Sequence, residues 1–534
     1  MMASNVSRDV SQDQSSVVQT CKPWYAFATV AAGRFVRFAS RVTKHGGSAL
    51  PGKVVEKIDP GFLTRTLGQL PLGVVLVSGT NGKTTTTRMV ASMLSDLGLK
   101  VFTNPTGSNF VRGVVSALLT EVTLGGKLDA DIAVLELDEA YAVHFVKQVK
   151  PRYALLLNVM RDQLDRFGEI DTTAKLLSHV AAATTGTVVL NREDPRIAAL
   201  AAKAPAGTTV RYFGLADDLR HYFPSDDDMA TTVSVEGAAG PLPSARTPLS
   251  PRSELRGAST GTAELPADVT LTAVGDHKAT FQMDGQGYAT DVKLEGVYNL
   301  YNAAAALAVV RAVAADAQAM FLPFEDALAD SVDADGADTG TETDGNGSHD
   351  AIDQAAADEI LRAAGVSPRM IAFAHATTQA MIDTAGEVTP AFGRGEVITV
   401  NGTPVELLLV KNPMGFRLSL ASFKPEGCDT MICINDEYAD GRDMSWLWDV
   451  DFTSLRGTGV KAVSGVRAWD MALRLEYDQV PVESVSTDLE ESVVNFVNAN
   501  SGTPKHIYCT YTAMLKTRAA LAKIADVADA GVGK

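Results

Sequence analysis

The sequence predicts an α/β fold, with a mainly parallel sheet covered by helices on both faces and a smaller α/β domain at the C-terminal end. Short apolar runs, such as residues 73–79 and 131–137, alternate with helical stretches, as expected of buried parallel strands joined by helical crossovers. A glycine-rich turn separates the first apolar run from the helical stretch that follows it. The same alternation begins again after residue 362, which indicates a second domain.

Each expected element of the first domain has a local pattern behind it. Residues 73–79 form an apolar run that ends in glycine, and the helical stretch 84–98 ends at another glycine. Residues 268–274 and 279–285 have the alternation of an antiparallel pair, and 298–317 read as a strong helix. The other expected strands lie within residues 99–104, 131–137, 152–159, 186–195, 405–413, 428–436 and 459–465.

Length and composition are those of a soluble globular protein with two or three domains. The chain has 534 residues, of which 46% are hydrophobic and 21% charged. Its net charge of −17 argues against nonspecific binding to nucleic acid or to anionic lipid. Scattered cysteines without a CxxC pair fit a reducing compartment. We find no uninterrupted run of about 18 apolar residues and therefore expect no membrane-spanning helix. We therefore expect a cytoplasmic protein, free or at the inner face of the membrane, with peripheral membrane contact only.

Shifts in composition divide the chain into four parts. Residues 1–22 are polar and are expected to be a disordered tail. Residues 23–315 carry the first α/β pattern, which an irregular insertion near 213–266 interrupts. Residues 316–361 are acidic and are expected to form a flexible insertion. Residues 362–534 are expected to form the second domain.

Residues from Trp24 to Val42 form a basic amphipathic stretch. Apolar residues recur at near-helical spacing, with Arg34, Arg37 and Arg41 between them. Two interpretations are open: a helix that touches a membrane surface, or a helix that packs on the domain with its arginines in water.

The sharpest local signal predicts phosphate binding between the first strand and the first helix. Glycines let backbone N–H groups turn toward one point, and the helix N-terminus adds the positive end of its dipole. A P-loop normally begins with glycine where this chain has Val77, so the alternative is an ordinary glycine-rich turn. The residues expected to bind the nucleotide here are Gly79, Thr80, Asn81, Gly82, Lys83, Thr84 and Thr85.

A magnesium site is predicted beside this turn. Lys83 would reach the terminal phosphates, and the Thr84 hydroxyl would ligate Mg²⁺. Glu136 lies at the carboxyl end of the strand at 131–137, where ligands bind in open α/β sheets. Mg²⁺ prefers such oxygen ligands. Asp138 and Glu139 follow in the same turn, and a solvated acidic loop is the alternative interpretation for these two.

Longer segments resemble a known family. The turn at residues 79–85 is similar to that of the Mur ligases and folylpolyglutamate synthases, and other segments resemble the MurT family of Mur ligase-like subunits. The resemblance implies a Mur ligase-like P-loop ATP-binding domain with a smaller α/β C-terminal domain. The segments that carry it are residues 104–114, 135–140, 158–171, 190–195, 296–306, 407–416, 434–452 and 464–477.

The resemblance implies an ATP-dependent carbon–nitrogen ligase of cell-wall synthesis. MurT proteins pair with GatD, a glutaminase that releases ammonia from glutamine. With ATP and Mg²⁺, the α-carboxylate of D-isoglutamate in the lipid II stem peptide would be phosphorylated, and ammonia would then displace phosphate to give D-isoglutamine. The expected partner is therefore a GatD-like glutaminase, and the expected substrate is lipid II.

The resemblance also implies positions for residues outside the turn. Tyr298 and Asn302 are expected near the adenine, Asp194 near the ribose, and Asn158 beside the bound nucleotide.

The reacting side is expected to be lined by Asn158 and by residues that follow it. Arg161 and Asp162 are the catalytic candidates there, with Asp165 beside them. Other Mur ligases commonly carry a histidine where this chain has Gln163, so a second metal held in that way is not expected.

An aspartate of the C-terminal domain is implied to complete the Cys–His site of the glutaminase partner. Asp443 is the first choice, with Asp440 and Asp449 as alternates. Such an aspartate would orient the partner's imidazole and stabilise its charged form. The alternative is that these residues serve only turns and helix caps, which aspartate favours.

The sequence departs from the family in one feature, and two alternative functions stay open. MurT proteins commonly carry a four-cysteine zinc ribbon, but this chain has no cysteine between Cys21 and Cys428, so no zinc is expected. An amino acid ligase like folylpolyglutamate synthase would need an amine pocket instead of an ammonia source. A non-catalytic ATP-binding scaffold for a glutaminase would not need Lys83, Thr84 and Glu136 together.

Overall fold

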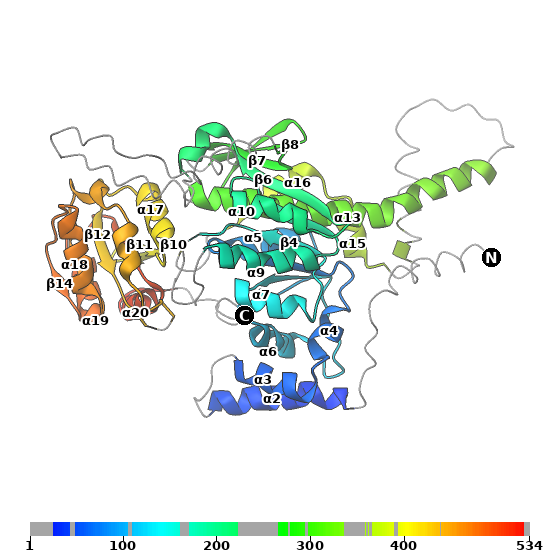
Figure 1. Cartoon of the computed structure of the whole chain (residues 1–534), viewed down its shortest axis with the longest axis horizontal. Helices are drawn as coiled ribbons and strands as arrows, with labels where there is room; N and C mark the ends of the chain where they lie inside the picture. The colour runs from blue at the N-terminus through cyan, green and yellow to red at the C-terminus, as the bar shows by residue number, and fades with distance from the viewer. Residues whose placement is uncertain are drawn as a thin grey trace, which may run out of the picture.

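The computed structural model of the chain contains two α/β units, each built around its own sheet (Figure 1). The predicted tail at 1–22 and most of the predicted insertion, from 223 to 264, lie outside the described residues. The structure describes residues 25–42, 49–104, 109–160, 170–222, 265–275, 278–293, 297–335, 358, 361–362, 366–388, 394–437 and 439–527.

The first unit is built on a nine-stranded sheet in the order β2-β3-β1-β4-β5-β6-β7-β8-β9. The strands from β2 to β7 pair in parallel, whereas β7, β8 and β9 form an antiparallel meander. The predicted α/β class and the predicted antiparallel pair are thus confirmed. The strands are β1 (Val74–Ser78), β2 (Val101–Thr103), β3 (Ile132–Glu136), β4 (Tyr153–Leu156), β5 (Thr187–Asn191), β6 (Thr209–Leu215), β7 (Val269–Gly275), β8 (Lys278–Met283) and β9 (Gln286–Asp291).

Helices cover both faces of this sheet because successive side chains of a buried strand point to opposite sides. In β1, Val75 and Val77 face the layer that contains α5 and α13, while Val74 and Leu76 face the layer that contains α6, α7 and α9. The helices of this unit are α2 (Ala26–Val42), α3 (Ala49–Ile58), α4 (Phe62–Leu67), α5 (Lys83–Asp96), α6 (Val111–Glu121), α7 (Glu139–Val146), α9 (Ile170–Ala183), α10 (Pro195–Ala198), α13 (Val297–Asp335), α15 (Pro368–Ala374) and α16 (Thr378–Glu387), with 3₁₀ turns η2 (Ala199–Lys203) and η3 (Asp217–Tyr222).

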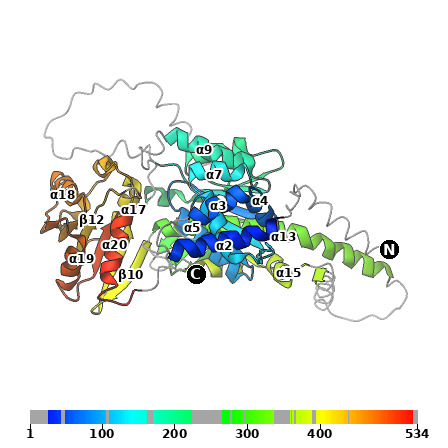
Figure 2. The same ribbon diagram turned by 90° about the horizontal axis from the view of Figure 1, so that it is seen from below.

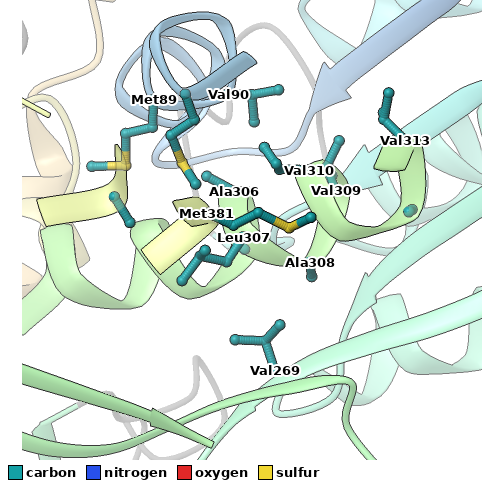
Figure 3. Packing of buried hydrophobic residues seen from close by; sticks show 14 of the residues in the cluster. Met89, Val90, Val269, Ala306, Leu307, Ala308, Val309, Val310, Val313 and Met381 are labelled. Carbon is teal, nitrogen blue, oxygen red and sulfur yellow. The ribbon is translucent and has the colours of Figure 1, made fainter. Parts of the chain in front are cut away.

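Helix α13 is the central core helix of the layer that also contains α5. Its residues 306–310 pack between Met89 of α5, Val269 of β7 and Met381 of α16 (Figure 3). Within the described residues, Tyr298–Met320 of α13 is the one stretch apolar and long enough to cross a membrane, but 67% of it is buried inside the protein. We therefore assign it to the core.

Two predicted boundaries differ from the structure. Residues 316–335, expected to be flexible, continue α13, and Asp316 forms an ion pair with Arg152 at 3.0 Å. Their alanine content favours helix in spite of their acidity. Helices α15 and α16, assigned from sequence to the second domain, bury Phe373 and Ile382 in the core of the first. The second domain therefore begins near residue 394, not at 362.

The second unit has a six-stranded sheet in the order β10-β11-β15-β12-β13-β14. All of its pairs are parallel except β10 with β11. Its two faces carry separate apolar cores, one against α19 and α20 and one against α17 and α18. The elements are β10 (Arg394–Val400), β11 (Thr403–Leu409), α17 (Pro413–Ser422), β12 (Asp429–Cys433), η4 (Ser445–Asp449), η5 (Thr453–Leu455), β13 (Ala462–Ser464), α18 (Ala468–Tyr477), β14 (Val485–Ser486), α19 (Leu489–Asn498), β15 (Lys505–Cys509) and α20 (Tyr511–Leu521).

Candidate active site

The turn between β1 and α5 is shaped by two glycines in the left-handed region of φ. Gly79 has φ +134° and Gly82 has φ +85°. A Cβ on Gly82 would lie 2.6 Å from Oδ1 of Asn302, and one on Gly79 would lie 3.0 Å from the backbone of Asn158. Larger residues are therefore excluded twice over, by conformation and by space.

Asn158, which follows β4, fastens the turn from the neighbouring strand. Its Oδ1 accepts a hydrogen bond from the Asn81 N–H at 2.8 Å, and its Nδ2 donates to the Asn81 carbonyl at 3.1 Å. The Thr80 N–H donates to the Asn158 carbonyl at 2.9 Å. The structure thus gives Asn158 a positioning role, because it fixes the turn before any ligand arrives.

Lys83 begins α5 and lies almost fully buried beneath the turn. Its Nζ donates to the carbonyl of Gly79 at 2.6 Å and lies 3.3 Å from Asp138 and 3.6 Å from Glu139. The acidic residues after β3 are therefore not a solvated loop, since they neutralise the buried ammonium group. A terminal phosphate would replace these partners of Lys83.

Thr84 and Glu136 meet at the predicted metal site. The Thr84 hydroxyl donates to Oε1 of Glu136 at 2.9 Å. Asn104, after β2, holds the backbone of Glu136 through a hydrogen bond on each side, at 2.9 Å and 3.0 Å. Two oxygen donors from adjacent elements thus lie at one point, as the sequence predicted.

The residues predicted to contact the nucleoside lie at different distances from the turn. Tyr298 and Asn302, on the first turns of α13, border Gly82 directly. Asp194 caps α10 and accepts hydrogen bonds from the N–H groups of Val159, Arg196 and Ile197. Burial raises the pKa of Asp194, and these hydrogen bonds oppose that rise. The role of Asp194 at a ribose stays a prediction.

Sequence reasoning assigned no role to two residues of the second unit that reach the turn. Asn412, after β11, donates from Nδ2 to Oδ1 of Asn81 at 2.8 Å, and Nζ of Lys411 donates to the Thr80 carbonyl at 3.4 Å. The Lys–Asn–Pro sequence between a strand and a capped helix was the available signal, because Asn412 also caps α17 through the Gly415 N–H. These contacts place the second unit against the phosphate-binding turn.

This contact between units gives a first prediction. Serine at position 412 still caps α17 but is too short to reach Asn81. We expect Asn412→Ser to lower kcat/KM about tenfold, the effect of losing hydrogen bonds worth about 1 kcal/mol each, with an unchanged melting temperature. Asn495→Ser, on the exposed side of α19, is the matched control. An unchanged kcat/KM in Asn412→Ser would show that the contact does not serve the reaction.

The three aspartates proposed for the partner's site differ sharply in surroundings. Asp440 is 2% exposed, and its carboxylate accepts hydrogen bonds from the N–H groups of Thr512 and Glu437 at 2.7 Å and 3.0 Å. Burial raises the pKa of Asp440. Asp443 and Asp449 are exposed. The Asp443 carboxylate accepts a hydrogen bond from the Ser445 N–H at 2.9 Å, and hydrogen bonds with Ser445 lower the pKa of Asp443.

Asp440 therefore serves the fold, because its oxygens join the segment before η4 to the start of α20. Asp443 and Asp449 remain available to a partner. Arg161, Asp162 and Asp165 lie outside the described residues, so their places on the reacting side stay predictions.

Comparison with known proteins agrees with this architecture. The family model described as Mur ligase middle domain matches residues 77–238, and the model described as MurT ligase C-terminal matches residues 409–514. The crystal structure of MurF from Acinetobacter baumannii is similar with a TM-score of 0.56 at 15% identity, covering 90% of this chain and 81% of that one. MurF from Thermotoga maritima, in complex with ADP, has a TM-score of 0.53 at 14% identity and covers 88% and 83%. These structures show the fold.

Two sequence relatives cover most of the chain. Each is named lipid II isoglutaminyl synthase (glutamine-hydrolyzing) subunit MurT. The relative from Streptococcus pneumoniae (strain ATCC BAA-255 / R6) is 28% identical over 506 residues, covering 92% of this chain and 96% of the relative. The relative from Staphylococcus aureus (strain COL) is 27% identical over 466 residues, covering 85% and 89%.

The fold and the site together define a P-loop ligase of the Mur type. A middle domain with this sheet, a lysine-bearing turn and a second α/β unit set against that turn are its parts. Two findings identify the family within this class of ligases. The C-terminal domain matches the MurT model, and the MurT relatives cover nearly the whole chain. The chain belongs to the MurT family.

Proposed function

We propose that the chain is the ligase subunit of a lipid II isoglutaminyl synthase, which uses ATP to amidate the α-carboxylate of D-isoglutamate in the lipid II stem peptide. One observation supports this function above all: the turn that carries Lys83 is in contact with a C-terminal domain of the MurT type. A turn without Lys83, or a C-terminal domain remote from it, would not support a ligase.

The turn suits the phosphates of ATP. Positive φ at Gly79 and Gly82 aims backbone N–H groups inward, and α5 adds its positive dipole end. Nδ2 of Asn302 is buried without a hydrogen-bond partner among the described residues, although it borders Gly82. A buried amide left unpaired costs free energy, and a bound nucleotide would supply its acceptor.

The donor set also fits a magnesium ion. The Thr84 hydroxyl and the Glu136 carboxylate would hold it, since both are hard oxygen donors. Bound Mg²⁺ would neutralise charge on the phosphates of the nucleotide. Asp138 and Glu139 lie against the buried Lys83, and Glu136 lies against the neighbouring Thr84, so a triphosphate arriving without a cation would meet excess negative charge.

The chemistry follows from the weakness of a carboxylate as an electrophile. One carboxylate oxygen attacks the γ-phosphorus of ATP, the bond from that phosphorus to the β-phosphate oxygen breaks, and ADP leaves. Ammonia then attacks the acyl carbon, the bond from that carbon to the phosphate oxygen breaks, and the amide nitrogen gives up a proton. Lys83 would stabilise the charge that develops on the transferred phosphoryl group.

The ammonia would come from a GatD-like glutaminase bound to the second unit. Asp443 and Asp449, which are exposed, are the candidates in this chain for completing its Cys–His site. Asp443 is held ionised by its hydrogen bonds with Ser445, and an ionised carboxylate is what an imidazolium needs beside it.

The test is amidation of lipid II by the purified complex with its glutaminase. Glutamine and ATP should convert lipid II to the product in which NH₂ replaces OH, seen by mass spectrometry of the stem peptide. The chain alone should do the same with ATP and ammonium. If the chain alone instead joined an amino acid to an acceptor, it would be an amino acid ligase. Full amidation by a complex carrying Lys83→Ala would indicate a scaffold.

The metal site gives a second prediction. Glutamine at position 136 still accepts a hydrogen bond from Thr84 but loses the charge that attracts Mg²⁺. We expect Glu136→Gln to raise the Mg²⁺ concentration needed for half-maximal ATPase activity by about tenfold to a hundredfold. Asp96→Asn, at the far end of α5, is the control. A Mg²⁺ dependence equal to that of the unchanged chain would remove Glu136 from the metal site.

A further inference from the structure

The outward face of helix α2 is apolar and uncovered by any described residue. Ala28, Ala31, Phe35 and Phe38 follow one another at helical spacing, and all are exposed. Phe35 is 70% exposed and Phe38 is 66% exposed. Figure 1 shows α2 at the outer edge of the first unit, beyond α3 and α6, and Figure 2 shows the same helix in front, on the side nearest the viewer. Two phenylalanine rings side by side in water are costly for a soluble protein.

This face is presented firmly, because the opposite face of α2 is anchored in the protein. Thr29 and Val30 are fully buried, and Gly33 packs closely against Leu119 of α6. The Arg34 guanidinium donates hydrogen bonds to the carbonyls of Leu119 and Val122 at the end of α6, at 2.9 Å and 2.5 Å. The contacts of the inner face account for the packing of α2 on the protein. They do not account for the exposure of Phe35 and Phe38.

Charge around α2 runs opposite to that of the chain as a whole. The net charge of the chain is −17, yet residues 14–55 contain no aspartate or glutamate. Such segregation leaves this segment of the sequence purely cationic on an otherwise acidic molecule, with Arg34, Arg37 and Arg41 on α2 itself. The cationic residues within that segment are Lys22, Arg34, Arg37, Arg41, Lys44 and Lys53.

We propose that α2 lies flat on an anionic lipid bilayer, with Phe35 and Phe38 inserted at the boundary between headgroups and acyl chains. Apolar rings beside a basic segment are the combination by which interfacial helices bind. The net acidity of the whole chain argued against such binding, but Asp59 and Glu56 beside α2 are paired with Arg65 and Arg112, and charge more than about 10 Å away is screened at moderate salt. A second copy of α2 fits less well, because it would bring the same positive charge against itself.

Membrane contact through α2 would suit an enzyme whose substrate is linked to lipid. This step rests on the proposed function, in which the substrate is lipid II. Helix α3, beside α2, packs on the first turn of α6, where a Cβ on Gly52 would lie 2.1 Å from the Arg112 carbonyl oxygen. The segment just before α6 reaches the nucleotide site, because the Asn109 carbonyl accepts a hydrogen bond from the Asp138 N–H at 3.1 Å. Docking through α2 would thus hold the carboxyl edge of the sheet close to the membrane.

The test is cosedimentation of the full chain with vesicles, without nucleotide or turnover. Binding is expected to vesicles of phosphatidylcholine mixed with phosphatidylglycerol, and to be weaker on phosphatidylcholine alone. The double variant Phe35→Ser/Phe38→Ser should bind at least about tenfold more weakly, since each ring contributes buried apolar area. Trp469→Ser/Tyr477→Ser removes two equally exposed aromatic rings from α18 and should bind like the unchanged chain.

Equal binding by the α2 variant and the unchanged chain would overturn the proposal, as would no binding to anionic vesicles. A change in the sedimentation mass of the α2 variant without vesicles would assign the face to a second copy, and would equally overturn it. Since vesicle binding needs no lipid II, the proposed amidation can fail while this inference holds. The reverse outcome, amidation of detergent-dispersed lipid II without vesicle binding, would remove this inference alone.

Discussion

Replacing Lys83 with methionine should lower ammonia-driven amidation by a factor of about a hundred to a thousand, the range seen when one preorganised group that stabilises developing charge is removed. The reason is the position of Nζ, which lies under the turn 2.6 Å from the Gly79 carbonyl and is held by buried carboxylates. Methionine keeps the length of the side chain and removes its charge. The measurement is single-turnover formation of the amide with saturating ATP and ammonium.

Replacing Lys83 is also expected to affect stability, because its carboxylate partners lose their counter-charge. Without the ammonium group, Glu139 is buried and unpaired, so Lys83→Met is also expected to lower the free energy of unfolding by about 1–3 kcal/mol. The double variant Lys83→Met/Glu139→Gln removes that penalty and should recover the melting temperature without recovering activity. Lys100→Met, at an exposed ion pair with Asp129, is the control. Activity that returned together with the melting temperature would mean that Lys83 serves only the fold.

The strands and the nucleotide turn were predictable because their signals are local. A buried parallel strand is a short apolar run wherever it occurs, and β1, β3 and β4 each lie within such runs. The turn needs only consecutive residues between β1 and α5. Thr84 and Glu136 could be paired from sequence because Glu136 ends β3 and Thr84 follows the adjacent strand β1, at the same edge of the sheet.

The contact between the units was not predictable in this way. Asn81 and Asn412 are 331 residues apart, and each asparagine alone is typical of a turn or cap. The predicted domain boundary at residue 362 was wrong for a related reason. Helices α15 and α16 carry apolar residues at helical spacing, and that spacing does not reveal which of two sheets they cover.

The aspartates between residues 440 and 449 were equivalent in sequence and are distinct in structure. By sequence, all three aspartates fit a capping role, and all three fit a partner's catalytic site. Only the fold shows that Asp440 is enclosed by the start of α20, while Asp443 and Asp449 face solvent. Because the three aspartates differ in exposure, replacing each of them separately is expected to give different results.

Asp443→Asn is expected to lower glutamine-driven amidation by about a thousandfold to ten thousandfold, as when the aspartate of a catalytic triad is replaced by asparagine, while ammonium-driven amidation stays unchanged. Asparagine still accepts a hydrogen bond from the Ser445 N–H, so the turn should survive. It cannot stabilise an imidazolium in the partner. The measurement compares both nitrogen sources in one preparation of the complex.

Asp449→Asn should show that same pattern in place of Asp443→Asn if Asp449, the exposed last residue of η4, is the one that meets the imidazole. Asp440→Asn should behave differently from both. It leaves one of the N–H groups of Thr512 and Glu437 without a carboxylate oxygen, so it should lower the melting temperature and affect both nitrogen sources alike. Equal loss with glutamine and ammonium in Asp443→Asn, at an unchanged melting temperature, would move Asp443 from the glutaminase site to the ligase chemistry. The contrast between nitrogen sources therefore separates a residue that orients the partner from one that holds its own domain together.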